Sequence, residues 1–409
     1  MHYAADHPVA AKNRRPQWEV ADVFCSCGPD YRRQHSLPRI HLKVMRAIET
    51  CRTAALGGHV EKCDRCGFER VSYNSCRNRH CPKCQSLAKA RWMENRKAEL
   101  LPVGYFHSVF TLPHELNPLV LCNKKTLFDI LFKAVSDTLQ EFGADPKHGL
   151  GGKLGCIAIL HTWDQTLRDH FHLHCLIPGG VLSPDGTSWT HARKNYLFPV
   201  KALSKAFRGK FLYLLKKAFK ESRLIFPGKT SSFASTRMFA RLLNQLWKKQ
   251  WVVYSKKPFA GPENVLDYLG RYTHRVAITN HRIAAVENGM VRFRYRDRRD
   301  HEKMKVMTLT AEEFIRRFLL HTLPDSYVRI RHFGFLANKC KERYLTLCRK
   351  ALHCTQKPGN SSPMDSRSLL LHLTGIDLNR CPHCSQGTMY IVKILPLNTP
   401  FIPYPMDSS

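Results

Sequence analysis

The stretch DHFHLHCLIPGG (residues 169–180) places His170, His172 and His174 at alternating positions between bulky apolar residues and ahead of two glycines. In a β-strand successive side chains point to opposite faces, so the three imidazoles share one face and the apolar residues share the other. The preceding stretch GKLGCIAILHTW (152–163) has the apolar character of a partner strand. The sequence therefore predicts a hairpin that packs on a core with one face and carries histidines on the other.

The register of this hairpin places a fourth histidine on the same face. A loop centred just after Thr166 pairs Trp163 with His170 and His161 with His172. Residues opposite each other in an antiparallel pair point to the same face. His161 is therefore expected to face His172 across the hairpin.

Imidazoles arranged in this way could hold a metal ion. At about 3.4 Å per residue, His170 and His174 lie roughly 13 Å apart, too far to share one ion. The predicted ligands are therefore His172 with His174, or His170 with His172, completed by His161, with Gln165 as a reserve. An ion with open positions would polarise a substrate oxygen. The alternative is that these histidines are hydrogen-bonded polar residues of a core.

The elements around the hairpin follow the order β-α-β-β-α-β, which is the ferredoxin-like plan of an antiparallel sheet with helices on one face. The expected fold class is therefore α+β. The predicted strands are 105–112, 152–163, 170–180 and 251–259, and the predicted helices lie within 117–142 and 199–221.

The charge of the chain points to nucleic acid. Lys and Arg number 65 against 32 Asp and Glu, a formal net charge of +33 in 409 residues. A protein with this excess is expected to bind a polyanion. No stretch of 18 apolar residues and no secretory segment is present, and several cysteines stand singly in apolar runs. The prediction is a cytoplasmic protein with reduced thiols and no membrane partner.

A cysteine-rich segment, CDRCGFERVSYNSCRNRHCPKCQ (63–85), contains two CxxC pairs separated by 14 residues. This spacing is typical of four thiolates around a structural Zn²⁺. Alternatives are a site in which Cys76 and His80 join the first pair, a second site completed by distant cysteines, and thiols without metal or with a redox role. The four primary candidates are Cys63, Cys66, Cys81 and Cys84.

The composition divides the chain into five parts. They are an N-terminal arm (1–35), a zinc-binding domain (36–101), a catalytic domain (102–300), an extension of that domain (301–354), and a linker and tail (355–409). The tail holds one further CxxC pair, Cys381 and Cys384, for which a metal site and an unmetallated pair are equally favoured.

Two tyrosines lie four residues apart in GPENVLDYLGRYTHR (261–275), which is expected to be a helix. Tyr268 and Tyr272 would then share one helical face, close to the cations Arg271 and Arg275, which are expected to bind DNA. A phenol, with a pKa of about 10, becomes a nucleophile toward phosphate only when its proton is lost and the phosphate charge is neutralised. The alternative is ordinary amphipathic packing.

A basic strand follows in HRIAAVENGMVRFRYRDRR (281–299), a hairpin pattern about Asn288-Gly289. Arg292, Arg294 and Arg296 would share one face, with aromatic residues on the other. Cations interleaved with aromatic rings are typical of surfaces that bind single-stranded nucleic acid. The alternative is a solvated hairpin packed on a core.

Several stretches together resemble one known family, the rolling-circle transposases of the insertion sequence 91 type, which are two-tyrosine HUH endonucleases. CRTAALGGHVEKCDRCG and YNSCRNRHCPKCQ resemble its N-terminal zinc-binding domain. YFHSVFTLPHEL, HLHCLIPGG, YLGRYTHRVAITNHRI and VRIRHFGFLAN resemble its catalytic domain.

The resemblance implies that His172 and His174 hold Mg²⁺ or Mn²⁺ and that Tyr268 and Tyr272 are catalytic. It also implies a bacterial, nucleoid-associated enzyme that nicks and rejoins single-stranded DNA through a 5′-phosphotyrosine. Rival interpretations are a replication initiator or relaxase, a metal-dependent hydrolytic nuclease, and a zinc-ribbon DNA-binding protein without catalysis. The sequence sets neither the DNA target nor the oligomeric state.

Overall fold

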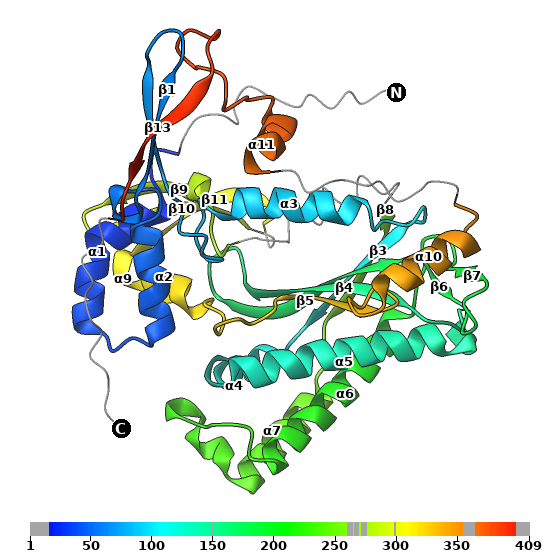
Figure 1. The fold of residues 1–409 in the computed structure, drawn as a ribbon. Coiled ribbons are helices and arrows are strands. Elements are labelled where there is room, and N and C mark those ends of the chain that lie inside the picture. Colours follow the sequence, from blue (N-terminus) through cyan, green and yellow to red (C-terminus); the bar gives the residue numbers. More distant parts are fainter. Residues whose placement is uncertain are drawn as a thin grey trace.

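The protein is described here by a computed structural model, which covers residues 16–148, 150–259, 265, 270, 276–297, 300–354 and 365–397. It is a mixed α+β fold in which helices surround several antiparallel sheets (Figure 1). The predicted fold class is confirmed. Among the described helices, none has the length and apolar character needed to cross a bilayer.

The central sheet has five strands in the order β12-β4-β5-β3-β8, and all neighbours are antiparallel. If β3, β4, β5 and β8 are numbered 1 to 4 in chain order, they lie side by side in the order 2-3-1-4. This is the predicted ferredoxin-like arrangement. β12 adds an edge strand beside β4. The strands are β3 (Tyr105–Thr111), β4 (Gly155–Trp163), β5 (Asp169–Pro178), β8 (Val253–Phe259) and β12 (Ile330–Gly334).

One face of this sheet packs on helices. Phe110, Phe171 and Leu173 are fully buried there, as the alternation in the strands predicts. The helices are α4 (Asn117–Cys122), α5 (Lys124–Ala144), α6 (Val200–Lys220) and α7 (Thr236–Lys248), with short 3-10 turns η3 (His114–Leu116), η4 (Pro146–His148) and η5 (Gly228–Ala234). Figure 1 shows α5, α6 and α7 together below the sheet.

The opposite face carries the histidines and a separate apolar cluster. Tyr105, Ile159 and Leu176 pack there with Val265 and Phe335. The covering elements are α3 (Gln85–Lys97), α10 (Lys341–Ala351) and the hairpin of β6 (Gly180–Leu182) and β7 (Trp189–His191). Figure 1 shows α3 above the sheet, opposite α5.

The N-terminal segment is integrated into the fold, in contrast to the predicted arm 1–35. Residues 20–34 form α1, whose Val20, Val23 and Phe24 are fully buried. Helical spacing puts these residues on one face despite Pro29 within the helix. They pack on the helix α9 (Ala311–Leu320), so α1 belongs to a core that includes residues from the C-terminal half of the chain.

This second core joins α1 (Val20–Gln34), α2 (Arg39–Glu49) and α9 (Ala311–Leu320) to a three-stranded sheet of order β11-β10-β9. The sheet contains the predicted hairpin, and Asn288 and Gly289 adopt φ of 51° and 71° at its turn, as a type I′ turn requires. Its elements are η6 (Asn280–Arg282), β9 (Ile283–Glu287), β10 (Met290–Asp297) and β11 (Lys303–Thr310).

A third sheet joins the N-terminal zinc-binding segment to the C-terminal tail. β1 (Gly58–Cys63), which follows the 3-10 turn η2 (Ala54–Leu56), pairs with β2 (Glu69–Tyr73) on one side and with β13 (Met389–Leu395) on the other. The tail was predicted as a separate linker and tail, but its described part folds onto the zinc-binding segment. The helix α11 (Ser366–Thr374) packs on α3. Figure 1 shows β1 and β13 side by side, projecting from the body.

Candidate active site and metal centres

The histidine hairpin forms as predicted, with one local change of register. His161 of β4 pairs with His172 of β5. Trp163 pairs with Asp169 and not with His170, because the register shifts between His161 and Trp163. A bulge of this kind adds one residue to a strand and moves every later pairing by one position. It leaves the predicted His161–His172 alignment intact.

Three imidazoles converge on one point. One ring nitrogen each of His161, His172 and His174 lies within 4.8 Å of the others, and all three side chains are buried. The Nε2 atoms of His172 and His174 are 3.1 Å apart. Two neighbouring ligands of an octahedral ion at about 2.1 Å would lie about 3.0 Å apart. The spacing therefore fits a cation site.

Hydrogen bonding orients the His172 ring toward this point. Its Nδ1 lies 2.9 Å from the backbone oxygen of His170, so Nδ1 carries the proton and Nε2 is left with its lone pair. The side chain of His170 is exposed and lies outside the converging group. This matches the distance argument that excluded a site containing both His170 and His174.

A further histidine, whose role the sequence did not predict, contacts the converging group. His107 of β3 places its Nε2 2.8 Å from Nδ1 of His174. Burial, and then the charge of Lys256, lower the pKa of His107 to about 4, so its ring is neutral. A neutral His107 can accept a hydrogen bond from the Nδ1–H of His174, which leaves the lone pair of Nε2 of His174 for an ion.

A cavity of about 450 Å³ opens beside the three imidazoles. Gln165 and His170 line it, so the predicted reserve ligand is near the site but outside the converging group. Tyr295 and Arg296 of β10 also line it. The hairpin therefore brings a basic and aromatic strand to the histidine cluster.

The three predicted DNA-binding arginines of β10 differ in their surroundings. All three are exposed. Arg296 lines the cavity, whereas Arg292 pairs with Glu287 at 3.1 Å. Arg294 lies between them and uses its backbone oxygen to accept a hydrogen bond from Arg282. Arg296 is therefore the arginine of this strip that lies at the site.

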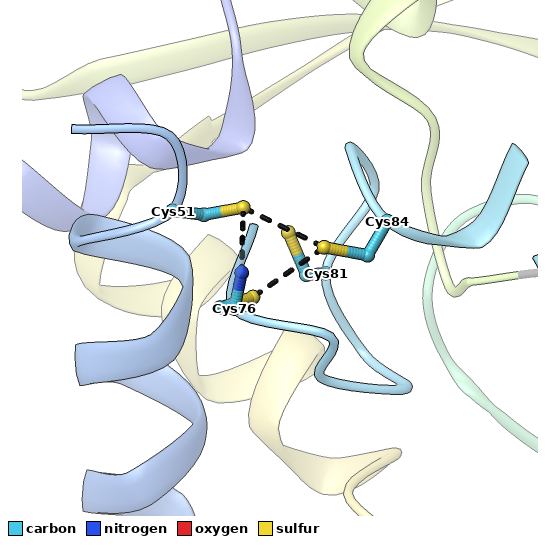
Figure 2. Close-up of side chains that lie close together, drawn as sticks. All are labelled: Cys51, Cys76, Cys81 and Cys84. Carbon is cyan, nitrogen blue, oxygen red and sulfur yellow. Dashed lines mark hydrogen bonds between the residues drawn. The ribbon is translucent and has the colours of Figure 1, made fainter. Parts of the chain in front are cut away.

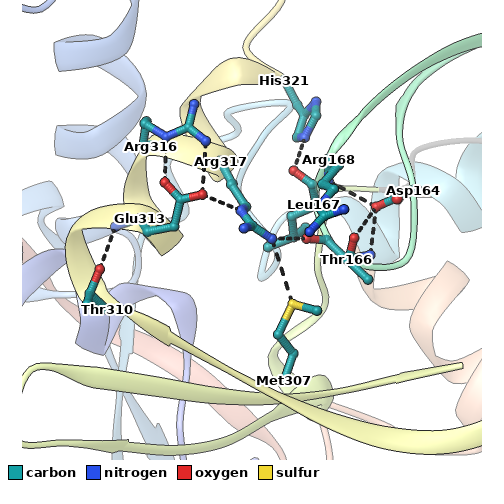
Figure 3. A network of polar contacts seen from close by, with 10 residues as sticks. All are labelled: Asp164, Thr166, Leu167, Arg168, Met307, Thr310, Glu313, Arg316, Arg317 and His321. Carbon is teal, nitrogen blue, oxygen red and sulfur yellow. Dashed lines mark hydrogen bonds and ion pairs between the residues drawn. The ribbon is translucent and has the colours of Figure 1, made fainter. Parts of the chain in front are cut away.

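The loop between β4 and β5 is fixed by α9 (Figure 3). Nη1 of Arg317 donates to the backbone oxygen of Thr166 at 3.0 Å, and Nε2 of His321 lies 3.0 Å from the backbone oxygen of Leu167. Glu313 in turn pairs with Arg317 at 2.6 Å. Asp164 accepts hydrogen bonds from within the loop itself. These contacts hold the ends of the two histidine strands.

The two candidate tyrosines and their neighbouring arginines, Tyr268, Tyr272, Arg271 and Arg275, lie outside the described residues. Their catalytic and DNA-binding roles stay predictions. Two positions of the same segment are described. Val265 is buried in the cluster on the histidine face of the sheet, and a Cβ at Gly270 would lie 2.8 Å from Cε of Lys89 on α3.

Four cysteines converge at the end of α2 (Figure 2). The Sγ atom of Cys84 lies 3.5 Å from that of Cys51 and 3.6 Å from that of Cys76, and Cys81 completes the group. Sulfurs bound tetrahedrally to Zn²⁺ at about 2.3 Å lie about 3.8 Å apart. The backbone N–H of Cys76 donates to Sγ of Cys51 at 3.5 Å, which favours the thiolate that binds metal.

This group differs from the predicted set. Cys81 and Cys84 are joined by Cys76, which was an alternative, and by Cys51, which was missed. Cys63 and Cys66 lie in another cluster, with Cys381 and Cys384, because the hairpin of β1 and β2 carries the first pair away from the second. The predicted single site is therefore divided between two clusters, as the alternative with distant cysteines allowed.

His80 is placed as a structural residue. Its Nε2 accepts a hydrogen bond from the backbone N–H of Leu323 at 3.4 Å, and it lies outside the cysteine groups. Burial, and then the charge of Arg329, lower the pKa of His80 to about 3. The alternative set containing His80 is not the one that the structure brings together.

Comparisons with known proteins define the class. Residues 23–112 match the family described as "Transposase zinc-binding domain", and residues 155–343 match the family described as "Putative transposase". The matched segments contain the first cysteine cluster and the histidine hairpin. The fold and the site thus belong to a transposase.

Two relatives specify the family. "Putative transposase y4qJ" of Sinorhizobium fredii (strain NBRC 101917 / NGR234) is 50% identical over 379 residues, which is 92% of this chain and 95% of the relative. "Transposase for insertion sequence element IS801" of Pseudomonas savastanoi pv. phaseolicola is 29% identical over 360 residues, 87% of this chain and 84% of the relative. The chain belongs to the transposases of the insertion sequence 91 type. No solved structure matches it significantly.

Proposed function

We propose that this transposase nicks and rejoins single-stranded DNA at the ends of its insertion sequence through a 5′-phosphotyrosine intermediate. One observation carries the proposal. Three buried imidazoles converge at a cavity that Tyr295 and Arg296 also line. The histidines proposed to hold a cation and the strand proposed to bind DNA thus lie at one cavity, which supports cleavage of a phosphodiester there.

Tyr268 and Tyr272 are the proposed nucleophiles. A phenolic oxygen bonds to the phosphorus, the bond from phosphorus to the 3′ oxygen breaks, and the 3′ oxygen gains a proton while the phenol loses one. The DNA keeps its 5′ phosphate on the tyrosine and ends in a free 3′-hydroxyl. Reversal with a different 3′-hydroxyl joins strands without a nucleotide triphosphate. Two tyrosines let one protein hold one end while it cuts another.

His161, His172 and His174 would hold the catalytic cation. When bound, a divalent cation would neutralise charge on the scissile phosphate. Imidazole donors fit Mn²⁺ better than Mg²⁺, whose preferred ligands are oxygens, so Mn²⁺ is the ion to test first. His107 would hold the proton on Nδ1 of His174, which keeps Nε2 directed at the ion.

Tyr295 and Arg296 are the proposed DNA contacts nearest the site. Bases of a single strand stack on aromatic rings, and guanidinium groups bind its phosphates. Arg271 and Arg275 would add charge from the tyrosine segment. Val265, three residues before Tyr268, is buried on the histidine face of the sheet.

The test is covalent capture. Labelled oligonucleotides from the ends of the element are incubated with the protein and Mn²⁺ or Mg²⁺, then separated on a denaturing gel. We expect an adduct with single strands but not with duplexes, weaker in Tyr268→Phe and in Tyr272→Phe and absent from the double variant. Tyr254→Phe, at an exposed tyrosine of β8, is the matched control.

Two alternative results would indicate another class of protein, and a third would reject the assigned nucleophiles. Cleavage without an adduct would favour a hydrolytic nuclease. Binding without cleavage would favour a regulator. An adduct that survives loss of both tyrosines would remove the assigned nucleophiles.

A further inference from the structure

A second group of four cysteines brings the N-terminal zinc-binding segment and the C-terminal tail together. Sγ of Cys63 lies 3.7 Å from Sγ of Cys384, and Sγ of Cys66 lies 3.7 Å from Sγ of Cys381. The partners are 321 and 315 residues apart in sequence. Four thiolates around Zn²⁺ would be separated by about 3.8 Å, whereas disulfide sulfurs lie about 2.05 Å apart. The spacing is that of a metal centre.

Backbone amides point at the sulfurs in both CxxC turns. Sγ of Cys63 accepts from the N–H groups of Arg65 and Cys66 at 3.4 and 3.5 Å. Sγ of Cys384 accepts from the N–H of Gly387 at 3.4 Å. Such amide hydrogen bonds stabilise a thiolate, which is the metal-binding form.

The two turns also bind each other directly. The N–H of Asp64 donates to the backbone oxygen of Thr388 at 3.1 Å, and the N–H of Thr388 donates to Oδ1 of Asp64 at 2.8 Å. A Cβ at Gly387 would overlap Sγ of Cys63 and would lie 2.6 Å from Oδ1 of Asp64. Position 387 therefore accepts only glycine while the two turns are docked.

Elements beyond the cysteines support the same junction. Cys63 pairs with Met389 as β1 meets β13, and buried Glu61 of β1 binds Arg70 of β2 and Arg367 of α11. The turns, the strands and this ion pair all attach the tail to the N-terminal domain.

We propose that Cys63, Cys66, Cys381 and Cys384 form a second zinc centre that clamps the C-terminal segment onto the N-terminal zinc-binding domain. The centre lies half outside residues 23–112, the extent of the matched zinc-binding family. A metal bridge that closes so long a loop restricts the unfolded chain strongly. It also covers an edge of β1 whose backbone groups would otherwise be unpaired on that side. The tail is thus part of the zinc-binding domain.

Zinc content of the purified full-length chain tests the proposal. We expect two zinc ions per chain in the wild type, one in Cys381→Ser/Cys384→Ser, and two in the matched control Cys340→Ser/Cys354→Ser, whose cysteines lie outside both clusters. Gly387→Ala should release one zinc to a chromogenic chelator faster than the wild type does. One zinc per wild-type chain, or two in Cys381→Ser/Cys384→Ser, would overturn the proposal.

A second measurement covers the case in which the cysteine variant folds poorly. A specific protease site placed within residues 355–364 allows the intact wild-type chain to be cut after folding. We expect the C-terminal fragment to stay bound in the presence of zinc and to leave when a chelator strips the ions. A fragment that stays bound after both zinc ions are removed would show that the metal does not clamp the tail.

Discussion

Removing the imidazole of His107 tests how the histidine site is oriented. The 2.8 Å hydrogen bond between His107 and His174 is buried, with side chains 3% and 7% exposed. Loss of such a supporting partner costs about 10- to 100-fold in metal affinity, or about 1.4–2.8 kcal/mol. A phenyl ring of similar size keeps the packing. We therefore expect His107→Phe to bind Mn²⁺ 10- to 100-fold more weakly.

The assay is titration of Mn²⁺ without DNA, followed by the paramagnetic resonance signal of the free ion. His107→Gln, whose amide oxygen can accept from His174, should recover part of the affinity. His332→Phe, on β12 of the same sheet but outside the converging group, should bind like the wild type. Binding of Mn²⁺ by His107→Phe as tightly as by the wild type, while His172→Ala loses the ion, would contradict the orienting role assigned to His107.

Three further variants test other parts of the structure. Arg296→Ala should weaken binding of single-stranded DNA and reduce the slope of log affinity against log salt concentration by about 0.7. Arg292→Ala should change both quantities little, because the guanidinium of Arg292 already pairs with a glutamate. Equal effects of the two variants would contradict the placement of the DNA. Glu61→Gln should speed hydrogen exchange in β13 roughly 10- to 100-fold, since a buried charged hydrogen bond contributes about 1.5–3 kcal/mol. The arginine partners of Glu61 lower its pKa. Protection of β13 against hydrogen exchange in the wild type should therefore persist above pH 4.5 and fall as the pH drops through the lowered pKa. Protection that does not change with pH would refute this. At Gly334, where φ is 64°, an added Cβ would overlap the Leu154 carbonyl oxygen, so Gly334→Ala should lower the free energy of unfolding by more than about 3 kcal/mol. Gly289→Ala, at φ 71° in open space, should lower it by only about 1–2 kcal/mol. Equal losses in denaturant titrations would count against the backbone described at residue 334.

Local periodicity was enough to predict the histidine hairpin. Alternation places Phe171 and Leu173 on one face and His172 and His174 on the other, and hairpin geometry brings His161 opposite His172. These relations depend on residues a few positions apart, so the sequence contains them directly. The bulge after His161 was missed, because nothing in the side-chain pattern marks the extra residue.

His107 shows the limit of this reasoning. Its place in β3 was predicted, but its contact with His174 depends on β3 lying next to β5, which is a property of the whole sheet. Arg296 is similar: its strand was predicted, and its position at the cavity depends on how β10 docks against the histidine hairpin.

The sequence by itself determined the residue types and short-range spacings: the strand histidines, the CxxC turns, the basic hairpin and the family. Tertiary structure alone decided which cysteines share a cluster. A CxxC turn brings two sulfurs together through four residues of backbone, but it carries no information about which other pair completes the tetrahedron. That choice depends on strand pairing between β1 and β13, more than 300 residues apart, and it separated Cys63 from Cys81.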